Sequence, residues 1–267
     1  MGAEAAAPPT ADERMTVAAA RLLPDGAVCF VGIGLPSKAA NLARATHAPD
    51  LVLIYEAGPI GAKPTVLPLS IGDGELAETA DAVVSTPEIF RYWLQGGRID
   101  VGFLGAAQID RFANLNTTVI GPYDRPSVRL PGAGGAPEIA AHAGEVFLVL
   151  NQSRRSFVER LDFVTTVGFL DGGGARERLG VSGRGPTAVV TDLGVLRPDP
   201  STRELVLTEL HPGVTVDEAR ARTGWPLRVS PDLRPTAEPT ARELEALREL
   251  EARSARARGR DPSGGGR

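Results

Sequence analysis

Two runs of consecutive apolar residues constrain the fold of this chain more than any other feature. Residues 27–31 read Ala-Val-Cys-Phe-Val and residues 51–55 read Leu-Val-Leu-Ile-Tyr, with a helical stretch over residues 37–45 between them. A strand that is apolar at every position is typical of a parallel strand buried on both faces of a sheet. A strand, a helix and a strand in this order form a βαβ unit, which predicts an α/β fold.

The same alternation continues along the chain. Further strands are predicted at residues 101–105, 146–150, 188–191 and 205–208, and further helices at residues 11–23, 85–95, 137–142 and 216–223. We therefore predict an open, mostly parallel sheet flanked by helices. A last helix over residues 240–256 carries Leu244, Leu247 and Leu250 among charged residues, which is the pattern of a surface helix.

Length and composition agree with one large α/β domain. The chain has 267 residues, of which 42% are hydrophobic and 23% are charged, as in ordinary globular proteins. The Ala- and Pro-rich residues 1–12 and the Gly-, Arg- and Ser-rich residues 258–267 are predicted to be disordered. The predicted organisation is a domain over residues 13–235, with residues 1–12 as a disordered N-terminus and residues 236–267 as a helix and a tail.

Charge, cysteine count and hydropathy exclude several classes of protein. A net charge of −4 does not predict a nucleic-acid-binding surface. The lone Cys29 cannot form an intrachain disulfide, and no cluster of Cys and His has the spacing of metal ligands. No stretch approaches the length of a membrane span, and the N-terminus lacks the pattern of a secretory signal. We therefore expect a cytoplasmic protein without a metal site, a membrane or a nucleic-acid partner.

Three segments are predicted to lie where ligands bind in a parallel sheet, which is beyond the carboxyl ends of the strands. Residues 32–36 (Gly-Ile-Gly-Leu-Pro) follow the first strand, and residues 55–58 (Tyr-Glu-Ala-Gly) follow the second. Residues 132–136 (Gly-Ala-Gly-Gly-Ala) precede a predicted helix. A ligand site formed by these segments is the main functional hypothesis from the residues alone.

Glu56 stands out because an apolar strand delivers its carboxylate directly into a glycine-containing turn. A glutamate in this position can be a nucleophile, a general base or a metal ligand, and it can equally be a capping or salt-bridging group. The small neighbours Ala57 and Gly58 favour a functional role, because they leave room for a ligand to approach the backbone.

The other candidate residues each allow a purely structural interpretation. Gly32 and Gly34 lack the third glycine of a dinucleotide fingerprint, so they are a weak nucleotide motif. Gly134 and Gly135 form either a tight turn or a group of backbone N–H donors that could stabilise an oxyanion or a phosphate. A turn rich in side-chain amides occupies residues 108–116, where Asn residues commonly cap the backbone.

Taken in order, these segments resemble the β subunits of class I coenzyme A transferases, most closely that of glutaconate CoA-transferase. The resemblance covers residues 17–229. It is carried by residues 31–36 (Val-Gly-Ile-Gly-Leu-Pro), 48–50 (Ala-Pro-Asp), 56–58 (Glu-Ala-Gly), 70–73 (Ser-Ile-Gly-Asp), 105–110 (Gly-Ala-Ala-Gln-Ile-Asp), 114–117 (Asn-Leu-Asn-Thr), 132–136, 176–180 (Arg-Glu-Arg-Leu-Gly) and 189–192 (Val-Val-Thr-Asp).

The resemblance implies a fold shared with ribose-5-phosphate isomerase-like proteins, an α subunit as partner and an active site at the subunit interface. It implies coenzyme A as a substrate, with no permanently bound cofactor. The site residues that it implies are Glu56 as the catalytic residue; Gly134, Gly135, Ala136, Gly32 and Gly34 for the oxyanion and coenzyme A; and Gln108 and Asn116 for the substrate. One departure is Ala57, where the family commonly has Ser.

The reaction that the resemblance implies moves coenzyme A between carboxylic acids through a glutamyl-CoA thioester on Glu56. The acid is a dicarboxylic acid such as glutaconate, or a 3-oxo acid. An ionised Glu56 is expected beside N–H donors or cations, because a wholly apolar pocket disfavours a charged carboxylate. Two alternatives stay open: a CoA-ester hydrolase or decarboxylase subunit of the same fold, and a non-catalytic partner subunit.

Overall fold

The structure, a computed structural model, describes residues 7–259. The helices are α1 (Ala11–Ala20), α2 (Leu35–Thr46), α3 (Gly74–Glu78), α4 (Thr86–Glu88), the π-helix η1 (Ile89–Leu94), α5 (Ala136–His142), α6 (Ala175–Leu179), α7 (Val216–Ala221) and α8 (Ala241–Ala257). The strands of the main sheet are β1 (Val28–Phe30), β2 (Val52–Ile54), β3 (Pro59–Ile60), β4 (Ala82–Val83), β5 (Val101–Leu104), β10 (Glu145–Val149), β11 (Pro186–Val190), β12 (Gly194–Pro198), β13 (Leu205–Leu210) and β14 (Arg228–Pro235).

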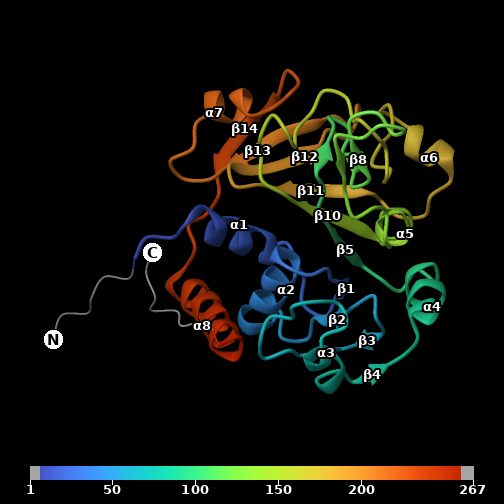
Figure 1. Cartoon of the computed structure of the whole chain (residues 1–267). Helices are drawn as coiled ribbons and strands as arrows, with labels where there is room; N and C mark the ends of the chain where they lie inside the picture. Colours follow the sequence, from blue (N-terminus) through green and yellow to red (C-terminus); the bar gives the residue numbers. More distant parts are fainter. Residues whose placement is uncertain (1–6, 260–267) are drawn as a thin grey trace.

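One ten-stranded sheet forms the centre of the molecule (Figure 1), with the order β14-β13-β12-β11-β10-β5-β1-β2-β3-β4. The five strands from β11 to β2 are parallel to one another. Antiparallel pairs flank them, β11 with β12 and β12 with β13 on one side, and β2 with β3 and β3 with β4 on the other. The predicted mostly parallel α/β sheet is confirmed.

Side chains that alternate along the central strands divide the core into two clusters, one on each face of the sheet. Cys29 and Leu53 point to the face that α1, α2 and α8 cover, and these three helices lie together in Figure 1. Phe30 and Ile54 are register partners and point to the opposite face, where η1 and α5 pack. Glu56 is two residues after Ile54, so its side chain leaves the backbone on the same face as Ile54.

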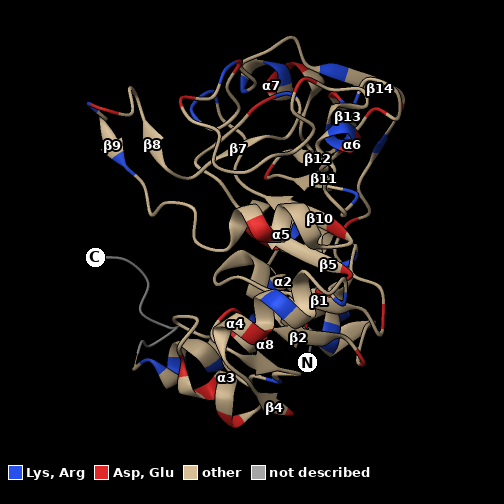
Figure 2. Ribbon diagram, turned by 90° about the vertical axis from the view of Figure 1, so that its right-hand side faces the viewer, with Lys and Arg blue, Asp and Glu red and all other residues tan. Residues whose placement is uncertain are grey.

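Two small antiparallel ribbons lie outside the main sheet. One joins β6 (Gln108–Ile109) to β7 (Leu115–Asn116), and the other joins β8 (Val119–Ile120) to β9 (Val128–Arg129). Figure 2 shows β8 and β9 extending away from the body of the molecule. The chain returns from β9 directly into the glycine-rich segment before α5, so this ribbon leads into the predicted ligand site.

Three predicted helices are present with differences in detail. Helix α1 begins at Ala11 as predicted, with a capping box of Thr10 and Glu13, so residues 11 and 12 of the segment predicted to be disordered are helical. Residues 85–95 are helical as predicted, mostly as the π-helix η1. Leu247 and Leu250 form the buried side of the predicted surface helix α8.

The ends of the chain were predicted to be disordered. Residues 1–6 and 260–267 lie outside the described part of the structure. Arg258, the first residue of the predicted disordered tail, is placed, and its guanidinium donates to the carbonyl oxygen of Leu67 at 2.6 Å.

Candidate active site

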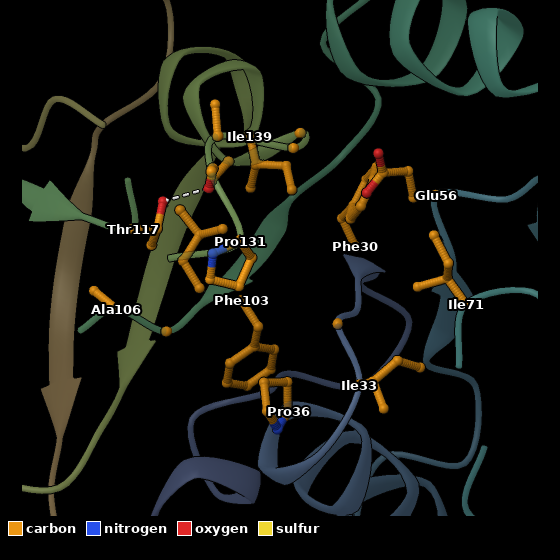
Figure 3. A pocket seen from close by; sticks show the side chains of 18 of the residues that line it. Phe30, Ile33, Pro36, Glu56, Ile71, Phe103, Ala106, Thr117, Pro131 and Ile139 are labelled. Carbon is orange, nitrogen blue, oxygen red and sulfur yellow. Dashed lines mark hydrogen bonds between the residues drawn. The ribbon is translucent and has the colours of Figure 1, made fainter. Parts of the chain in front are cut away.

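A cavity of about 490 Å³ opens at the carboxyl ends of β1, β2 and β5, beneath the glycine-rich loop that leads into α5. Its walls are mostly apolar, and Figure 3 shows Glu56 and Ile71 on one side, across from Thr117 and Pro131 on the other. Among the described residues that line the cavity, Glu56 is the only ionisable side chain. A mostly apolar pocket with one placed polar group is the usual character of a small-molecule site.

The backbone presents Glu56 to this cavity through a tight turn. The N–H of Gly58 donates to the carbonyl oxygen of Tyr55 at 3.0 Å, which places Glu56 at the first central position of a four-residue turn. Gly58 has a φ of +121°, and a Cβ there would lie 2.0 Å from the carbonyl oxygen of Val84. Only glycine therefore fits at residue 58, because any side chain would collide with the backbone of Val84.

Tyr55 anchors the strand end on the opposite face of the sheet. Its side chain is fully buried, and its hydroxyl lies 3.2 Å from the hydroxyl of Ser37 in α2. Burial raises the pKa of this phenol, so it stays neutral and acts as a hydrogen-bonding group of the core. Because neighbouring side chains of an extended segment point to opposite faces, the burial of Tyr55 directs the half-buried Glu56 toward the cavity.

The glycine-rich loop forms the wall of the cavity that lies nearest to Glu56. Gly134, Gly135 and Ala136 all line the cavity, and a Cβ built on Gly135 would lie 3.5 Å from the carboxyl carbon of Glu56. The hydroxyl of Thr117 donates to the carbonyl oxygen of Gly132 at 2.8 Å and fixes the start of the loop. The structure thus brings the predicted nucleophile and the predicted oxyanion loop side by side.

Of the four other predicted site residues, only one lines the cavity. Gly32 lines the cavity, whereas Gly34 lies outside the lining and serves as the N-cap residue of α2 with a φ of +83°. Gln108 and Asn116 also lie outside the lining, and both are buried. The structure does not bring these two amides into the cavity, and their role in substrate binding stays a prediction.

The amides of Gln108 and Asn116 are used inside the protein. The Asn116 amide N–H donates to Oε1 of Gln108 at 2.7 Å and to the carbonyl oxygen of Val119 at 2.6 Å. The Gln108 amide N–H donates to Asp162 at 2.9 Å. Buried amides whose donors and acceptors are satisfied internally stabilise a fold, and here they join the β6–β7 ribbon to its neighbouring loops.

No donor or cation of the described residues contacts the Glu56 carboxylate, although such neighbours were expected. Within residues 7–259, Glu56 makes no hydrogen bond to a backbone or side-chain donor and no ion pair. Its carboxylate therefore remains free to contact a molecule that enters the cavity. In the same described range, no group of three or more His, Cys, Asp or Glu residues could hold a metal ion, and no helix is long and apolar enough to cross a bilayer.

The aromatic residues at the site were missed from the sequence. Phe30 of β1 and Phe103 of β5 line the cavity, and the ring of Phe90 in η1 packs behind Phe30, 6.0 Å away from centroid to centroid. All three had been interpreted only as apolar residues of strands and a helix. The sequence holds no signal that connects Phe90 to this site. Phe90 lies 34 positions after Glu56, and its contact with Phe30 depends on how η1 packs.

Fold and site together define a class of protein. A mostly parallel sheet presents one carboxylate, free of internal partners, in an apolar cavity beside a glycine-rich loop. That arrangement suits covalent transfer chemistry, in which a side-chain carboxylate attacks an activated carbonyl carbon.

Comparison with known proteins places the chain more closely. A family model described as Coenzyme A transferase matches residues 12–221. The chain belongs to the coenzyme A transferase family. It is 66% identical over 248 residues to the β subunit of 3-oxoadipate CoA-transferase of Pseudomonas knackmussii, covering 93% of this chain and 95% of the relative. It is 36% identical over 227 residues to the β subunit of glutaconate CoA-transferase of Acidaminococcus fermentans, covering 83% and 85%.

Solved structures agree on the fold. The crystal structure of glutaconate coenzyme A-transferase from Acidaminococcus fermentans superposes with a TM-score of 0.85 at 32% identity, covering 91% of this chain and 94% of that one. The decarboxylase AibA/AibB superposes with a TM-score of 0.79 at 29% identity, covering 93% and 98%. The predicted family and fold are confirmed, and sequence identity is higher to the 3-oxoadipate relative than to the glutaconate relative.

Proposed function

We propose that this chain is the glutamate-bearing subunit of a two-subunit coenzyme A transferase and that Glu56 carries the acyl exchange as a covalent nucleophile. The observation that supports this most strongly is the position of Glu56: a half-buried carboxylate without internal partners, in an apolar cavity, beside the backbone of Gly135. A carboxylate held for a structural purpose would be paired within the chain.

The chemistry proceeds by exchange of acyl groups. A carboxylate oxygen of Glu56 attacks the carbonyl carbon of the donor thioester, and coenzyme A leaves as the thiolate, which gives a mixed anhydride. The thiolate then attacks the glutamyl carbonyl carbon, and the donor acid leaves as its carboxylate. Glu56 is now a thioester of coenzyme A. The acceptor acid repeats these steps in reverse and leaves as the new CoA ester, so no water or external oxidant is consumed.

Each step passes through a tetrahedral oxyanion at the reacting carbonyl carbon. The backbone N–H groups of the loop that carries Gly134 and Gly135 are the proposed donors to this oxyanion, since a Cβ built on Gly135 would lie 3.5 Å from the Glu56 carboxyl carbon. In enzymes that use such donors, each contributes about 3 kcal/mol to the transition state. The apolar walls support the same purpose, because they exclude the water that would hydrolyse the anhydride.

We propose that the active complex contains an α subunit beside this chain. The two relatives compared above are each named as one subunit of their enzyme, and this chain covers 95% and 85% of their lengths. The cavity contains no cation of this chain among the residues described, so the partner is the proposed source of charge that recognises anionic substrates. We also propose a cytoplasmic location, where CoA esters are formed and used.

The proposed acceptor is 3-oxoadipate. It is both a dicarboxylic acid and a 3-oxo acid, which are the two substrate classes that the sequence resemblance implied. The support for it is the 66% identity to the Pseudomonas relative of that name. The cavity itself supports only an acid with an apolar chain near the reacting carboxylate.

The test uses this chain co-expressed with the α subunit. The pair is given an acyl-CoA donor and either 3-oxoadipate or glutaconate, and the new CoA ester is measured by chromatography. We expect 3-oxoadipyl-CoA as the main product, and a loss of rate on the order of 10³-fold or more in Glu56→Gln. The matched control is Glu78→Gln on α3, an exposed glutamate away from the cavity, which should keep the wild-type rate.

Three outcomes would contradict the proposal. Full activity of Glu56→Gln would identify the chain as a non-catalytic partner subunit. Release of free coenzyme A without a new ester would identify a hydrolase, and loss of carbon dioxide from the donor acyl group would identify a decarboxylase. Preference for glutaconate would contradict only the proposed acceptor.

A further inference from the structure

The π-helix η1 brings the aromatic ring of Phe90 against the glycine-rich loop and the Phe30 ring, both of which line the cavity. The carbonyl oxygen of Phe90 accepts from the N–H of Gln95 at 2.8 Å, and that of Trp93 accepts from Arg98 at 2.8 Å. These bonds span five residues and widen the helix, and such wide turns occur frequently at functional sites. Phe90 is half-buried and, unlike its exposed neighbour Tyr92, faces the core and the ring of Phe30.

Phe90 is packed against the backbone of Gly135. A Cβ built on Gly135 would lie 2.7 Å from Cζ of Phe90, closer than real Cβ contacts, and 3.0 Å from its Cε1, which is a tight contact. The same Cβ would lie 3.5 Å from the carboxyl carbon of Glu56, which is an ordinary contact. Gly135 therefore lies between the aromatic ring and the carboxylate, and it is the ring that leaves no room for a side chain.

Backbone conformation does not explain the glycine at this position. Gly135 has a φ of −82° and a ψ of −1°, which alanine adopts without strain. Its neighbour Gly134 differs, since its φ is +50° and its Cβ would meet no atom within 4 Å. At residue 135 it is therefore the space taken by the Phe90 ring, and not the backbone conformation, that opposes a side chain.

A second contact joins η1 to the segment formed by the glycine-rich loop and α5. The side-chain amide of Gln95, just after η1, donates to the carboxylate of Glu138 in α5 at 3.1 Å. The η1 helix is therefore joined to the loop and to α5 at both of its ends, through Phe90 and through Gln95. A shift of η1 moves the loop relative to the β2 turn that carries Glu56.

We infer that Phe90 is a positioning residue for the acyl exchange: its ring fixes the separation between the backbone of Gly135 and the carboxylate of Glu56. The inference rests on the proposed covalent role of Glu56. Oxyanion stabilisation depends steeply on the distance between donor and oxygen, and displacements near 1 Å cost as much as about 100-fold in rate. Phe90 acts on the chemical step and not on the binding of coenzyme A.

The first test compares Phe90→Ala, Phe90→Met and Phe112→Ala in the co-expressed pair. Phe112→Ala is the matched control, because a Cβ built on Gly172 would lie 2.6 Å from the Phe112 ring, a similar contact outside the cavity. For Phe90→Ala we expect kcat to fall about 10-fold or more, with KM for the CoA ester within about twofold of wild type. Phe90→Met should recover most of kcat, since methionine fills irregular space. Phe112→Ala should keep the wild-type kcat even if it lowers the melting temperature as much as Phe90→Ala does.

The second test is a double-mutant cycle that does not depend on the stability of one variant. Gly135→Ala should lower kcat, because its methyl group overlaps the Phe90 ring. Adding Phe90→Ala provides the missing space, so the double variant should be faster than Gly135→Ala alone. Additive losses in the cycle, or a wild-type kcat in Phe90→Ala, would overturn the inference.

Borohydride separates failure of this inference from failure of the proposed function. It reduces a glutamyl thioester, so wild-type enzyme incubated with an acyl-CoA should be inactivated, and the inactivated residue should be Glu56. Phe90→Ala should reach the same adduct more slowly. Inactivation at an unchanged rate in Phe90→Ala would overturn the inference and leave the covalent role intact. Absence of a wild-type adduct would overturn both.

Discussion

Glu56 and Gly58 show how a few residues of one turn place a reactive group. The carboxylate depends on a turn that only glycine can close, and on the buried Tyr55 that orients the strand end. The sequence predicted the strand, the turn and the carboxylate, because each is a local feature of residues 51–58. The ring that limits the loop beside Glu56 was not predictable, since it comes from a helix whose packing no local pattern reports.

Replacement of Gly58 tests the turn. Gly58→Ala should lower the free energy of unfolding by at least about 2–3 kcal/mol, because the methyl group meets the Val84 carbonyl oxygen and the φ is unfavourable. Urea denaturation measures this loss. Gly26→Ala is the control: its φ is +73° but its Cβ meets no atom within 4 Å, so only about 1–2 kcal/mol should be lost. Equal losses would show that the Val84 contact is unimportant.

The elements of the parallel centre were predicted well, and those at the edges were not. The five central strands consist mostly of consecutive apolar residues, which is the signal that two-sided burial leaves in a sequence. Strands β3 and β4 have two residues each and carry no such signal. Residues 85–95 were predicted only as helical, because six residues are too few to distinguish a π-helix from an α-helix. The sequence could not place Gln108 and Asn116 outside the cavity, because buried amides that pair within the protein and amides that bind a ligand look alike in a sequence.

Helix α8 is part of the core, and its contribution can be measured. Leu247 is 1% exposed, and α8 packs against α1 and α2. Leu247→Ala should lower the free energy of unfolding by about 2–5 kcal/mol in urea denaturation, which is the usual cost of such a cavity. The exposed Glu245→Ala should have little effect. A loss below about 0.5 kcal/mol for Leu247→Ala would mean that α8 is dispensable for the fold.

His211 connects three strands at the far side of the sheet, and it should make stability depend on pH. Nε2 lies 2.9 Å from the carbonyl oxygen of Thr191 after β11, and Nδ1 lies 2.8 Å from the hydroxyl of Thr236 after β14. A neutral ring protonated on Nε2 satisfies both contacts. Burial lowers the pKa of His211 below its ordinary value of 6.5, so the folded state favours the neutral ring.

The sign of this effect follows from proton binding. Below about pH 6.5 the unfolded chain binds a proton at His211 that the folded chain does not, so stability should fall as the pH falls. Melting temperatures at pH 7.5 and 5.5 measure this loss, and His211→Gln should make it smaller. An unchanged pH dependence in His211→Gln would show that other groups, such as paired carboxylates, account for the whole effect.

At the scale of the whole molecule, the sheet brings distant segments to one cavity. Glu56 comes from the end of β2, Phe30 from β1 and the glycine-rich loop from residues 132–136, and Phe90 of η1 packs against that loop. The apolar rim residues Leu69 and Ile71 are 66% and 41% exposed, and Ile71 also lines the cavity. The two-subunit assembly that we propose accounts for apolar side chains exposed beside an active site.

The most direct measurement of the central claim is the mass of the peptide that contains Glu56. The co-expressed pair is mixed with an acyl-CoA in the absence of an acceptor acid, quenched, digested and analysed by mass spectrometry. We expect this peptide to gain the mass of coenzyme A less one water, and to lose it when 3-oxoadipate is added before quenching. An unmodified peptide under turnover conditions, or coenzyme A attached to any other residue, would contradict the account.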